Sequence, residues 1–509
     1  MTKDLKEAYS LPNLRRAWKW LRTNREALFK NYVRHIGRAY AMCTEENLQD
    51  LHERLKERVY SPSHSTKLFF PKKTGILRPF SLLTIEDQIV YQALVNVAAD
   101  SLLPHARSQY YKTVFGNLYA GKRSKYFYRP WEKAYSRFSR SIRKAYFSGF
   151  VFTASFDLTA CYDSIDHRVL KHFLSRIGMS KDFCQELCTY LSIWTSSSPE
   201  TPIYQGHGIP QGPLASGILA ECVLKHFDDN YGPTTKIRYF RYVDDIRLFA
   251  KSELELTQSL IRLDRLSKEI GLFPQSGKID THRIKNIAEE TKTLSDPTET
   301  AAITDHPDQS AIRKRLIELS LRFEIKNETR FKFVLGRTLP TCSIGIRLSR
   351  ILTQHPHLYQ SICRCLKKSS LLPKRVSHAF LRVLLTHRLY ASLAAELLNT
   401  LSGRIHPKYR NDLLRYCKKQ LRPGGLDPYY PELRAACASF LVQSVALTYK
   451  QIKYNVRWSK NWWVRTIVAS HIPKHLLCNA KYTSLINRLL RDDHADVALV
   501  ATEILIENN

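Results

Sequence analysis

Alternating apolar and polar residues predict a short β-hairpin at residues 238–250, which read RYFRYVDDIRLFA. This alternation is typical of strands that bury one face. The paired residues Asp244 and Asp245 stand where the two predicted strands turn. Because aspartate is a favoured turn residue, a surface turn is the simplest interpretation of this segment taken alone.

A second predicted strand also ends on an aspartate. The β-rich run at 151–156 leads into Asp157, and a helix is predicted to begin near Ser164 or Asp166 and to close at Gly178. The apolar residues on one face of this helix are Val169, Leu170, Phe173, Leu174 and Ile177. Carboxylates held side by side repel each other, and a divalent cation removes that penalty. Their hard oxygen atoms suit magnesium, so the two aspartate sites together indicate a metal centre.

Between the two aspartate sites, residues 208–221 read GIPQGPLASGILAE and predict an exposed loop that opens into an apolar helix. Glycines in such a loop allow a nucleotide or a template strand to approach the main chain closely. An ordinary loop remains an equally good interpretation of this segment by itself.

Helical periodicity dominates the rest of the chain. Residues 1–60 look helical, and from residue 311 onward the chain is a series of leucine-rich stretches, among them 372–401, 430–452 and 493–507. Pairs of such helices are typical of a HEAT-like solenoid, although the letters contain no strict repeat and an irregular helical bundle stays open. The segment 287–310 is acidic, rich in threonine and broken by prolines, which predicts a linker or an exposed excursion.

Charge points to a polyanionic partner. The chain has 79 Lys and Arg against 46 Asp and Glu, a formal net charge of +33, and such an excess attracts nucleic acid. Basic and aromatic residues interleave over 107–144, where Glu132 is the only carboxylate. This segment could grip a single strand by charge and stacking. Alternatively, since Trp131, Tyr135 and Phe138 have helical spacing, the rings pack inward and the basic face is solvated.

Other classes of protein fit the composition poorly. With 509 residues, 44% of them hydrophobic, the chain can bury a large core and should form two or three domains. The 11 cysteines show no C-x-x-C pair and no zinc-site spacing, so we expect reduced, buried thiols. We see no signal peptide and no apolar stretch long enough to span a bilayer, and therefore expect a cytoplasmic protein without a membrane partner.

The order of these motifs resembles the palm of reverse transcriptases. The segments that match palm motifs A to D are FDLTACYDSIDH (156–167), GIPQGPLASG (208–217), YVDD (242–245) and GLFPQSGK (271–278), and residues 71–90 resemble the fingers motif that meets the incoming triphosphate. The resemblance covers about residues 60 to 285. It implies an α+β fold with right-hand polymerase fingers and palm, followed by an all-α, HEAT-like helical C-terminal domain. The implied domains are an N-terminal helical segment (1–60), fingers and palm (61–285), a linker or excursion (286–310) and a helical thumb with the C-terminal domain (311–509).

The resemblance implies a catalytic role for each matching aspartate. Asp157 and Asp244 would hold two Mg²⁺ ions, with Mn²⁺ as the alternative ion, and Asp245 would sit beside them. The carbonyl oxygen of Leu158 would be a further metal ligand. Tyr162 falls at the steric-gate position of the family, where a bulky ring rejects a 2′-hydroxyl and selects deoxynucleotides.

The remaining matching residues would contact the substrate. Gln211 would support the templating base pair, and Lys278 would assist the leaving pyrophosphate. Lys72 and Arg78 would bind the triphosphate, because phosphoryl transfer depends on positioning and charge stabilisation. A solvated basic hairpin is the alternative interpretation of these last two residues.

The helical tail narrows the choice among reverse transcriptases. We see no carboxylate cluster of an RNase H domain and no Cys/His spacing of a zinc endonuclease, and retron enzymes are usually shorter. What remains resembles the bacterial abortive-infection and defence-associated reverse transcriptases. The chain departs from intron-type enzymes in lacking a clear F-L-G-F or F-L-G-Y element after motif D, which leaves the primer grip unplaced.

The predicted function is therefore DNA synthesis from dNTPs by two-metal phosphoryl transfer in antiphage defence, with priming by a protein tyrosine and no template as one option. The expected partners are dNTPs, a single-stranded DNA product or an RNA template, and further copies of the chain. Alternatives are cDNA synthesis on a dedicated small RNA and a polymerase-derived scaffold that only binds nucleic acid. A viral RNA polymerase fits less well, because that family generally carries GDD where this chain has YVDD.

Overall fold

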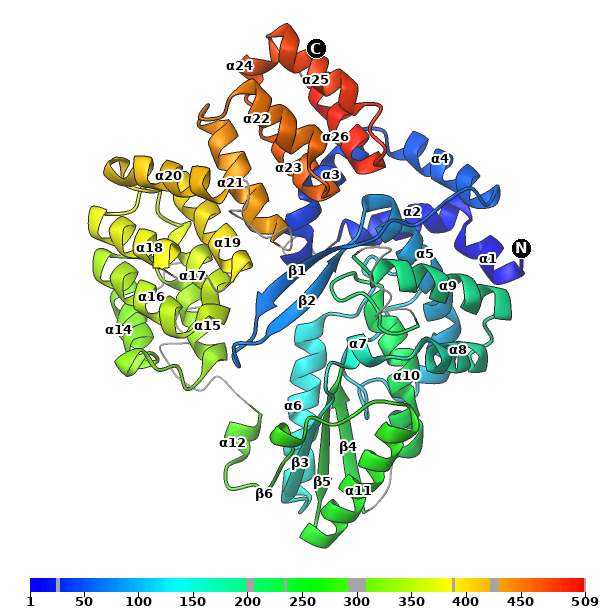
Figure 1. Cartoon of the computed structure of the whole chain (residues 1–509). Helices are drawn as coiled ribbons and strands as arrows, with labels where there is room; N and C mark the ends of the chain where they lie inside the picture. Colours follow the sequence, from blue (N-terminus) through cyan, green and yellow to red (C-terminus); the bar gives the residue numbers. More distant parts are fainter. Residues whose placement is uncertain are drawn as a thin grey trace. The chain divides into compact units, whose positions relative to one another are not determined.

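The computed structural model describes residues 1–23, 28–197, 206–232, 236–291, 308–386, 390–421 and 430–507. The chain forms two compact units that alternate along the sequence. The first unit comprises residues 1–34, 43–66 and 81–293, and the second comprises 35–42, 67–80 and 294–509. Figure 1 labels their helices and strands. Within the described ranges, no helix combines the length and the apolar character needed to cross a membrane.

A four-stranded antiparallel sheet, in the order β4-β5-β3-β6, forms the centre of the first unit. Its strands are β3 (Phe152–Asp157), β4 (Ile237–Tyr242), β5 (Asp245–Ala250) and β6 (Asp280–Arg283). The predicted hairpin at 238–250 is thus β4 and β5. Phe156 lies opposite Ile246, and Ala154 lies opposite Leu248. All four of these side chains are buried, as expected for one face of a pleated sheet.

Helices cover the sheet and form the rest of the first unit. Helix α11 (Glu253–Glu269) packs against β3 and β5, and α6 (Trp131–Phe147) packs against β4. Helix α5 (Ile85–Ala106) packs against α10 (Ser216–Asn230), the helix predicted after the glycine-rich loop. The other helices that begin in this unit are α1 (Lys3–Ala8), α2 (Leu11–Leu21), α3 (Leu28–Met42), α4 (Thr44–Lys56), α7 (Cys161–Ser164), α8 (His167–Arg176), α9 (Lys181–Trp194) and α12 (Ile287–Glu290).

Local sequence signals explain the helix that follows β3. The Asp166 side chain accepts a hydrogen bond from the Arg168 N–H, so Asp166 is the N-cap of α8, as predicted. Gly178 follows the end of this helix and has φ +93°. Glycine adopts this left-handed conformation without a steric penalty because it has no Cβ. A short helix, α7, precedes this cap and was not predicted separately.

In the basic and aromatic segment at 107–144, helix α6 buries some of its rings and leaves one exposed. In α6, the Phe138 ring is buried and belongs to an apolar cluster with Phe240 and Phe249 of the sheet. Trp131 on the same helix is 64% exposed. Most rings at helical spacing therefore pack inward, as Phe138 and Tyr135 do, while Trp131 stays accessible for stacking.

The second unit consists of helices and one β-hairpin, formed by β1 (Thr66–Pro71) and β2 (Leu77–Leu82). Its principal helices are α14 (Gln309–Glu318), α15 (Glu328–Arg337), α16 (Cys342–Gln354), α17 (Tyr359–Leu366), α18 (Lys374–Thr386), α19 (Ala391–Ser402), α20 (Arg410–Gln420), α21 (Pro431–Gln443), α22 (Tyr449–Lys453), α23 (Trp462–Ser470), α24 (Lys474–Leu477), α25 (Ala480–Leu489) and α26 (Ala495–Ile506). Helices two apart in sequence pack together along the series α15-α17-α19-α21-α23. This pattern is typical of stacked helical pairs.

The predicted fold class is confirmed: an α+β region is followed by a helical C-terminal region. All 11 cysteines are free, and only Cys43 and Cys478 are exposed, which agrees with the predicted buried thiols. Most of the predicted linker at 286–310, namely residues 292–307, lies outside the described residues.

Candidate active site

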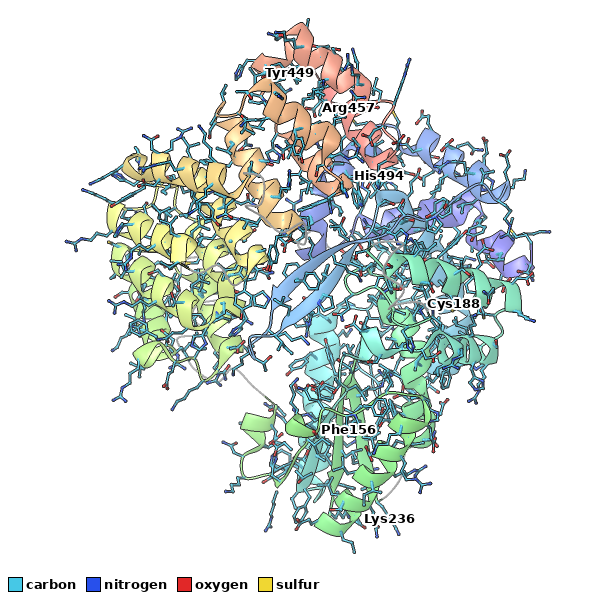
Figure 2. The ribbon with its side chains drawn as sticks, in the orientation of Figure 1. Phe156, Cys188, Lys236, Tyr449, Arg457 and His494 are labelled. Carbon is cyan, nitrogen blue, oxygen red and sulfur yellow. The ribbon has the colours of Figure 1, made fainter. Side chains whose placement is uncertain are left out.

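Strand register brings the predicted catalytic aspartates together. Asp157 at the end of β3 lies directly opposite Asp245 at the start of β5, and Asp244 precedes it in the β4–β5 turn. Phe156, labelled in Figure 2, is the residue before Asp157 on β3. Side chains in directly opposed positions of an antiparallel pair are neighbours, so these two carboxylates repel. Antiparallel pairing of β3 with β5 thus brings the aspartate of motif A next to the aspartates of motif C.

Two basic side chains offset this repulsion. Lys278 donates a hydrogen bond from Nζ to Asp157 Oδ2 at 2.6 Å. Arg247 Nε lies 3.3 Å from Asp245 Oδ1. Lys278 comes from the motif D segment, which is attached to the end of β3 by a hydrogen bond of 2.8 Å from the Gln275 N–H to the Asp157 carbonyl. Leu158, the predicted carbonyl ligand, is buried and bridges to Pro274 of the same segment.

The turn that carries Asp244 has an unusual backbone. Val243 has φ +59°, a left-handed conformation that costs a β-branched residue on the order of 1–3 kcal/mol. Arg241 compensates by donating from Nη1 to the Val243 carbonyl at 2.8 Å. Gly116 packs closely against this turn: a Cβ at position 116 would stand 2.4 Å from the Val243 nitrogen. Only glycine fits at position 116, so the backbone of this segment packs directly against the turn.

Arg241 is fully buried and ties this turn to α10. Its Nη2 lies 2.7 Å from Glu221 Oε2 and 2.6 Å from Asp228 Oδ2, and both carboxylates belong to α10. The Tyr239 hydroxyl also donates a hydrogen bond to Asp228, at 2.8 Å. Burial raises the pKa of Glu221 to about 7, although Arg241 opposes that shift. The motif B helix and the motif C turn are therefore joined through one guanidinium.

The sequence interpretation missed Arg241. The available signal was an arginine near the end of a strand of mostly apolar and aromatic residues, three residues before Asp244. Arginine is almost never fully buried without a partner, so its position called for carboxylates elsewhere in the core. Which carboxylates these were could not be read from spacing.

Tyr162 and Gln211 lie in two segments that contact each other. The Tyr162 carbonyl accepts a hydrogen bond from the Ile209 N–H at 2.8 Å. Gln211 donates from Nε2 to Asp163 Oδ2 at 2.7 Å, next to Tyr162 in sequence. Burial raises the pKa of the Tyr162 phenol above its ordinary value, so it stays protonated near neutral pH. These two hydrogen bonds join helix α7 of motif A, which carries Tyr162, to the motif B loop, which carries Gln211.

One glycine of motif B has a packing reason that the sequence did not reveal. A Cβ at Gly217 would lie 2.4 Å from the Tyr128 hydroxyl oxygen. Tyr128 in turn donates a hydrogen bond to the Leu214 carbonyl at 2.8 Å. Close packing against protein therefore accounts for Gly217, whereas the predicted approach of a nucleotide to the main chain stays a prediction for Gly208 and Gly212.

Lys72 and Arg78 belong to the second unit. They lie on the β1–β2 hairpin, with Lys72 half-buried and Arg78 exposed. The Lys72 N–H donates to the Ile76 carbonyl at 2.8 Å and closes the turn. Their contact with a triphosphate stays a prediction.

The donor atoms at the aspartates fit hard divalent cations. Asp157, Asp244 and Asp245 offer carboxylate oxygens without any soft ligand among them, and carboxylates are what magnesium prefers. In the part of the chain that the structure describes, no group of three or more His, Cys, Asp or Glu side chains is arranged to hold an ion. The fit therefore rests on donor chemistry and on the register of β3 and β5.

Comparison with known families agrees with this geometry. Residues 70–295 match the family model described as reverse transcriptase (RNA-dependent DNA polymerase). This segment, somewhat less than half of the chain, is therefore similar to reverse transcriptase domains. The matched range contains Asp157, Asp244 and Asp245.

Comparison with individual proteins adds less. No curated protein matches the chain. Among solved structures, the chain is similar to apo telomerase from Candida tropicalis, with 12% identity, a TM-score of 0.35, and coverage of 70% of this chain and 65% of that one. It is also similar to telomerase from Candida albicans in complex with a TWJ fragment of telomeric RNA, with 13% identity, a TM-score of 0.32, and coverage of 82% and 67%. The chain thus spans less than two thirds of the apo telomerase, and TM-scores this low carry no functional argument.

We expect Arg241→Met to lower the free energy of unfolding by about 3–5 kcal/mol, because Glu221 and Asp228 lose their buried cation. Denaturant unfolding of the full chain measures this loss. Arg283→Met on β6 of the same sheet is the matched control, because Arg283 is exposed and its guanidinium lies over the Phe152 ring, so the change should cost about 1 kcal/mol or less. Equal losses in the two variants would contradict a supporting role for the Arg241 network.

Proposed function

We propose that this chain is a DNA polymerase of reverse transcriptase type that adds dNTPs by two-metal phosphoryl transfer. The observation that carries the proposal is the direct pairing of Asp157 with Asp245, with Asp244 in the adjoining turn, inside a domain that matches reverse transcriptases. Asp157 and Asp244 would hold the two magnesium ions, and the Leu158 carbonyl would be a further ligand. When bound, such ions activate the attacking hydroxyl and stabilise the leaving phosphate oxygen.

The basic and polar side chains of the site would bind and orient the substrate. Lys278, whose Nζ donates a hydrogen bond to Asp157 Oδ2, is the basic side chain suited to neutralise the leaving pyrophosphate. Gln211, held through Nε2 by Asp163, would present its face to the templating base pair. Lys72 and Arg78 would bind the triphosphate oxygens. The Tyr162 ring would exclude a 2′-hydroxyl by bulk.

The narrower proposal is a role in antiphage defence, as in the abortive-infection and defence-associated reverse transcriptases. What supports it is the architecture: a reverse transcriptase domain is joined to a unit of stacked helices. Stacked helical pairs present extended surfaces that suit partner subunits or strands. In this proposal the enzyme is cytoplasmic, acts as an oligomer, and makes single-stranded DNA either from a protein primer or on an RNA template.

Asp157→Asn and Asp244→Asn should each abolish incorporation of labelled dNTPs with magnesium. Each change removes a charge from the proposed metal site while it keeps the side-chain volume. Primer extension with purified protein measures the loss. Asp280→Asn is the matched control, because Asp280 is exposed on β6 and its side chain pairs only with His282 among the described contacts, so near-normal incorporation is expected. Normal incorporation by either site variant would rule out this metal centre.

Tyr162→Ala should raise the use of ribonucleotides relative to deoxynucleotides by about 10- to 100-fold, because the ring no longer fills the space of a 2′-hydroxyl. Competition between labelled NTPs and dNTPs measures the ratio. Tyr162→Phe retains the ring and should keep the wild-type preference. An unchanged ratio in Tyr162→Ala would make this tyrosine a packing residue.

Cells that carry the wild-type gene should resist some phages, and cells with the Asp244→Asn gene should lose that resistance. The reason is that defence in this proposal depends on DNA synthesis at the aspartates. Plating efficiency across a broad phage panel tests this, with Asp280→Asn as the control and light scattering to verify an unchanged oligomeric state. Equal plating on wild-type and Asp244→Asn cells would refute the defence role and leave the polymerase proposal intact.

A further inference from the structure

The β1–β2 hairpin is part of the helical unit. Its residues 67–80, which include Lys72 and Arg78, cluster with the C-terminal helices of the second unit. An isolated two-stranded hairpin is marginally stable in water, so its conformation depends on the groups that cover it. The contacts that the helices make with this hairpin therefore decide where its two basic side chains are held.

Side chains of α19 and α21 pair with the backbone of β1. Ser392 on α19 is buried and donates from Oγ to the Phe69 carbonyl at 2.8 Å. The Phe69 N–H donates to the Glu432 carboxylate on α21, a group whose pKa burial raises to about 7. A strand edge leaves backbone groups that need partners when they are covered. Both main-chain groups of Phe69 find those partners on helices more than 300 residues later in the chain.

Tyr390 holds the tip of the hairpin. Its hydroxyl donates to the Gly75 carbonyl at 2.9 Å, and Tyr390 is also the N-cap residue of α19. Gly75 has φ +85° and donates its N–H to the Lys72 carbonyl at 3.0 Å, so the tip and Lys72 form one hydrogen-bonded turn. Lys73 adds a longer ion pair of 3.6 Å with Glu328, which is worth little because Lys73 is exposed.

The surroundings of the tip are loosely packed. A cavity of about 340 Å³ lies beside the Tyr390 hydrogen bond, lined among others by Lys73, Thr74, Leu352, Gln354, Val383 and Leu393. Because side chains leave this space open, van der Waals contact restrains the tip weakly. The hydrogen bond from Tyr390 therefore contributes a large share of the restraint at this end of the hairpin.

We propose that Tyr390 and Ser392 are positioning residues through which the helical unit sets the affinity for the incoming nucleotide. They act by fixing the hairpin that carries Lys72 and Arg78. The inference rests on the proposed function, in which these two cations bind the triphosphate. Coulomb attraction depends on distance, so a hairpin released from the helices would bind the triphosphate more weakly without changing the chemistry at the aspartates.

Hydrogen exchange on the full chain tests the docking without any need for activity. Tyr390→Phe and Ser392→Ala each remove one hydroxyl, and amides of residues 67–80 should exchange about five-fold faster in each variant, as expected for one net hydrogen bond. Tyr449→Phe is the matched control, because this tyrosine of the same unit contacts the Tyr482 ring (Figure 2 labels Tyr449). Its hairpin amides should exchange as in the wild type. Unchanged exchange in both test variants would overturn the proposal.

Nucleotide kinetics test the positioning role. In Tyr390→Phe and Ser392→Ala, KM for dNTP should rise about three- to ten-fold, while kcat stays within about two-fold. Lys72→Gln should raise KM as well, and combining it with Tyr390→Phe should add little, because both changes act on the same contact. A purely structural role of Tyr390 would lower the amount of active enzyme and hence kcat, and would leave KM unchanged.

The two ways of failing can be told apart. If Lys72→Gln raises KM while Tyr390→Phe and Ser392→Ala leave it at the wild-type value, the inference is overturned and the proposed function stands. If the wild-type chain incorporates no dNTP, both the proposed function and the inferred effect on nucleotide affinity fail. The exchange experiment would still show whether the helices hold the hairpin.

Discussion

The turn that carries Asp244 depends on the hydrogen bonds and ion pairs of the buried Arg241 guanidinium. Burying a cation costs several kcal/mol unless partners surround it, and here two carboxylates and one backbone carbonyl do so. Both carboxylates come from α10, the helix that follows the motif B loop, while the carbonyl belongs to the turn before Asp244. A group that is expensive to bury thus connects the segments whose relative position matters most for catalysis.

The segment around Gly116 also packs against the turn that carries Asp244. This segment bonds to β4 on both sides, because the Phe115 N–H donates to the Arg241 carbonyl at 2.9 Å and the Arg241 N–H donates to the Thr113 carbonyl at 2.8 Å. The turn is therefore bracketed by a segment 120 or so residues earlier and by α10, and the left-handed Val243 is retained between them. Precision in the position of Asp244 arises from neighbours that never touch a substrate.

Much of the catalytic domain was predictable from the sequence, and the reasons are local. The strands ending at Asp157 and flanking Asp244 follow from period-two alternation, and the N-cap Asp166 follows from its place before a periodic apolar face. The partners of Arg241, the pairing of Lys278 with Asp157 and the packing of Gly217 on Tyr128 were beyond prediction. Each joins residues that are far apart in the chain, and a spacing rule contains no information about such contacts. For the same reason, the resemblance of residues 71–90 to a fingers motif contained no sign that residues 67–80 cluster with the helices of the second unit.

The alternation of the two units along the chain has a consequence for the order of folding. The helical unit includes residues 35–42, where His35 Nε2 lies 2.9 Å from Thr466 Oγ1 and Arg38 pairs with Glu503, across 431 and 465 residues. Closing loops of this length is slow, and early segments must wait for partners that the ribosome delivers last. The first unit ends at residue 293, so we expect its sheet and helices to assemble during synthesis, before the later helices emerge. The basic hairpin, although made among the first hundred residues, would reach its final support only when nearly the whole polypeptide has emerged.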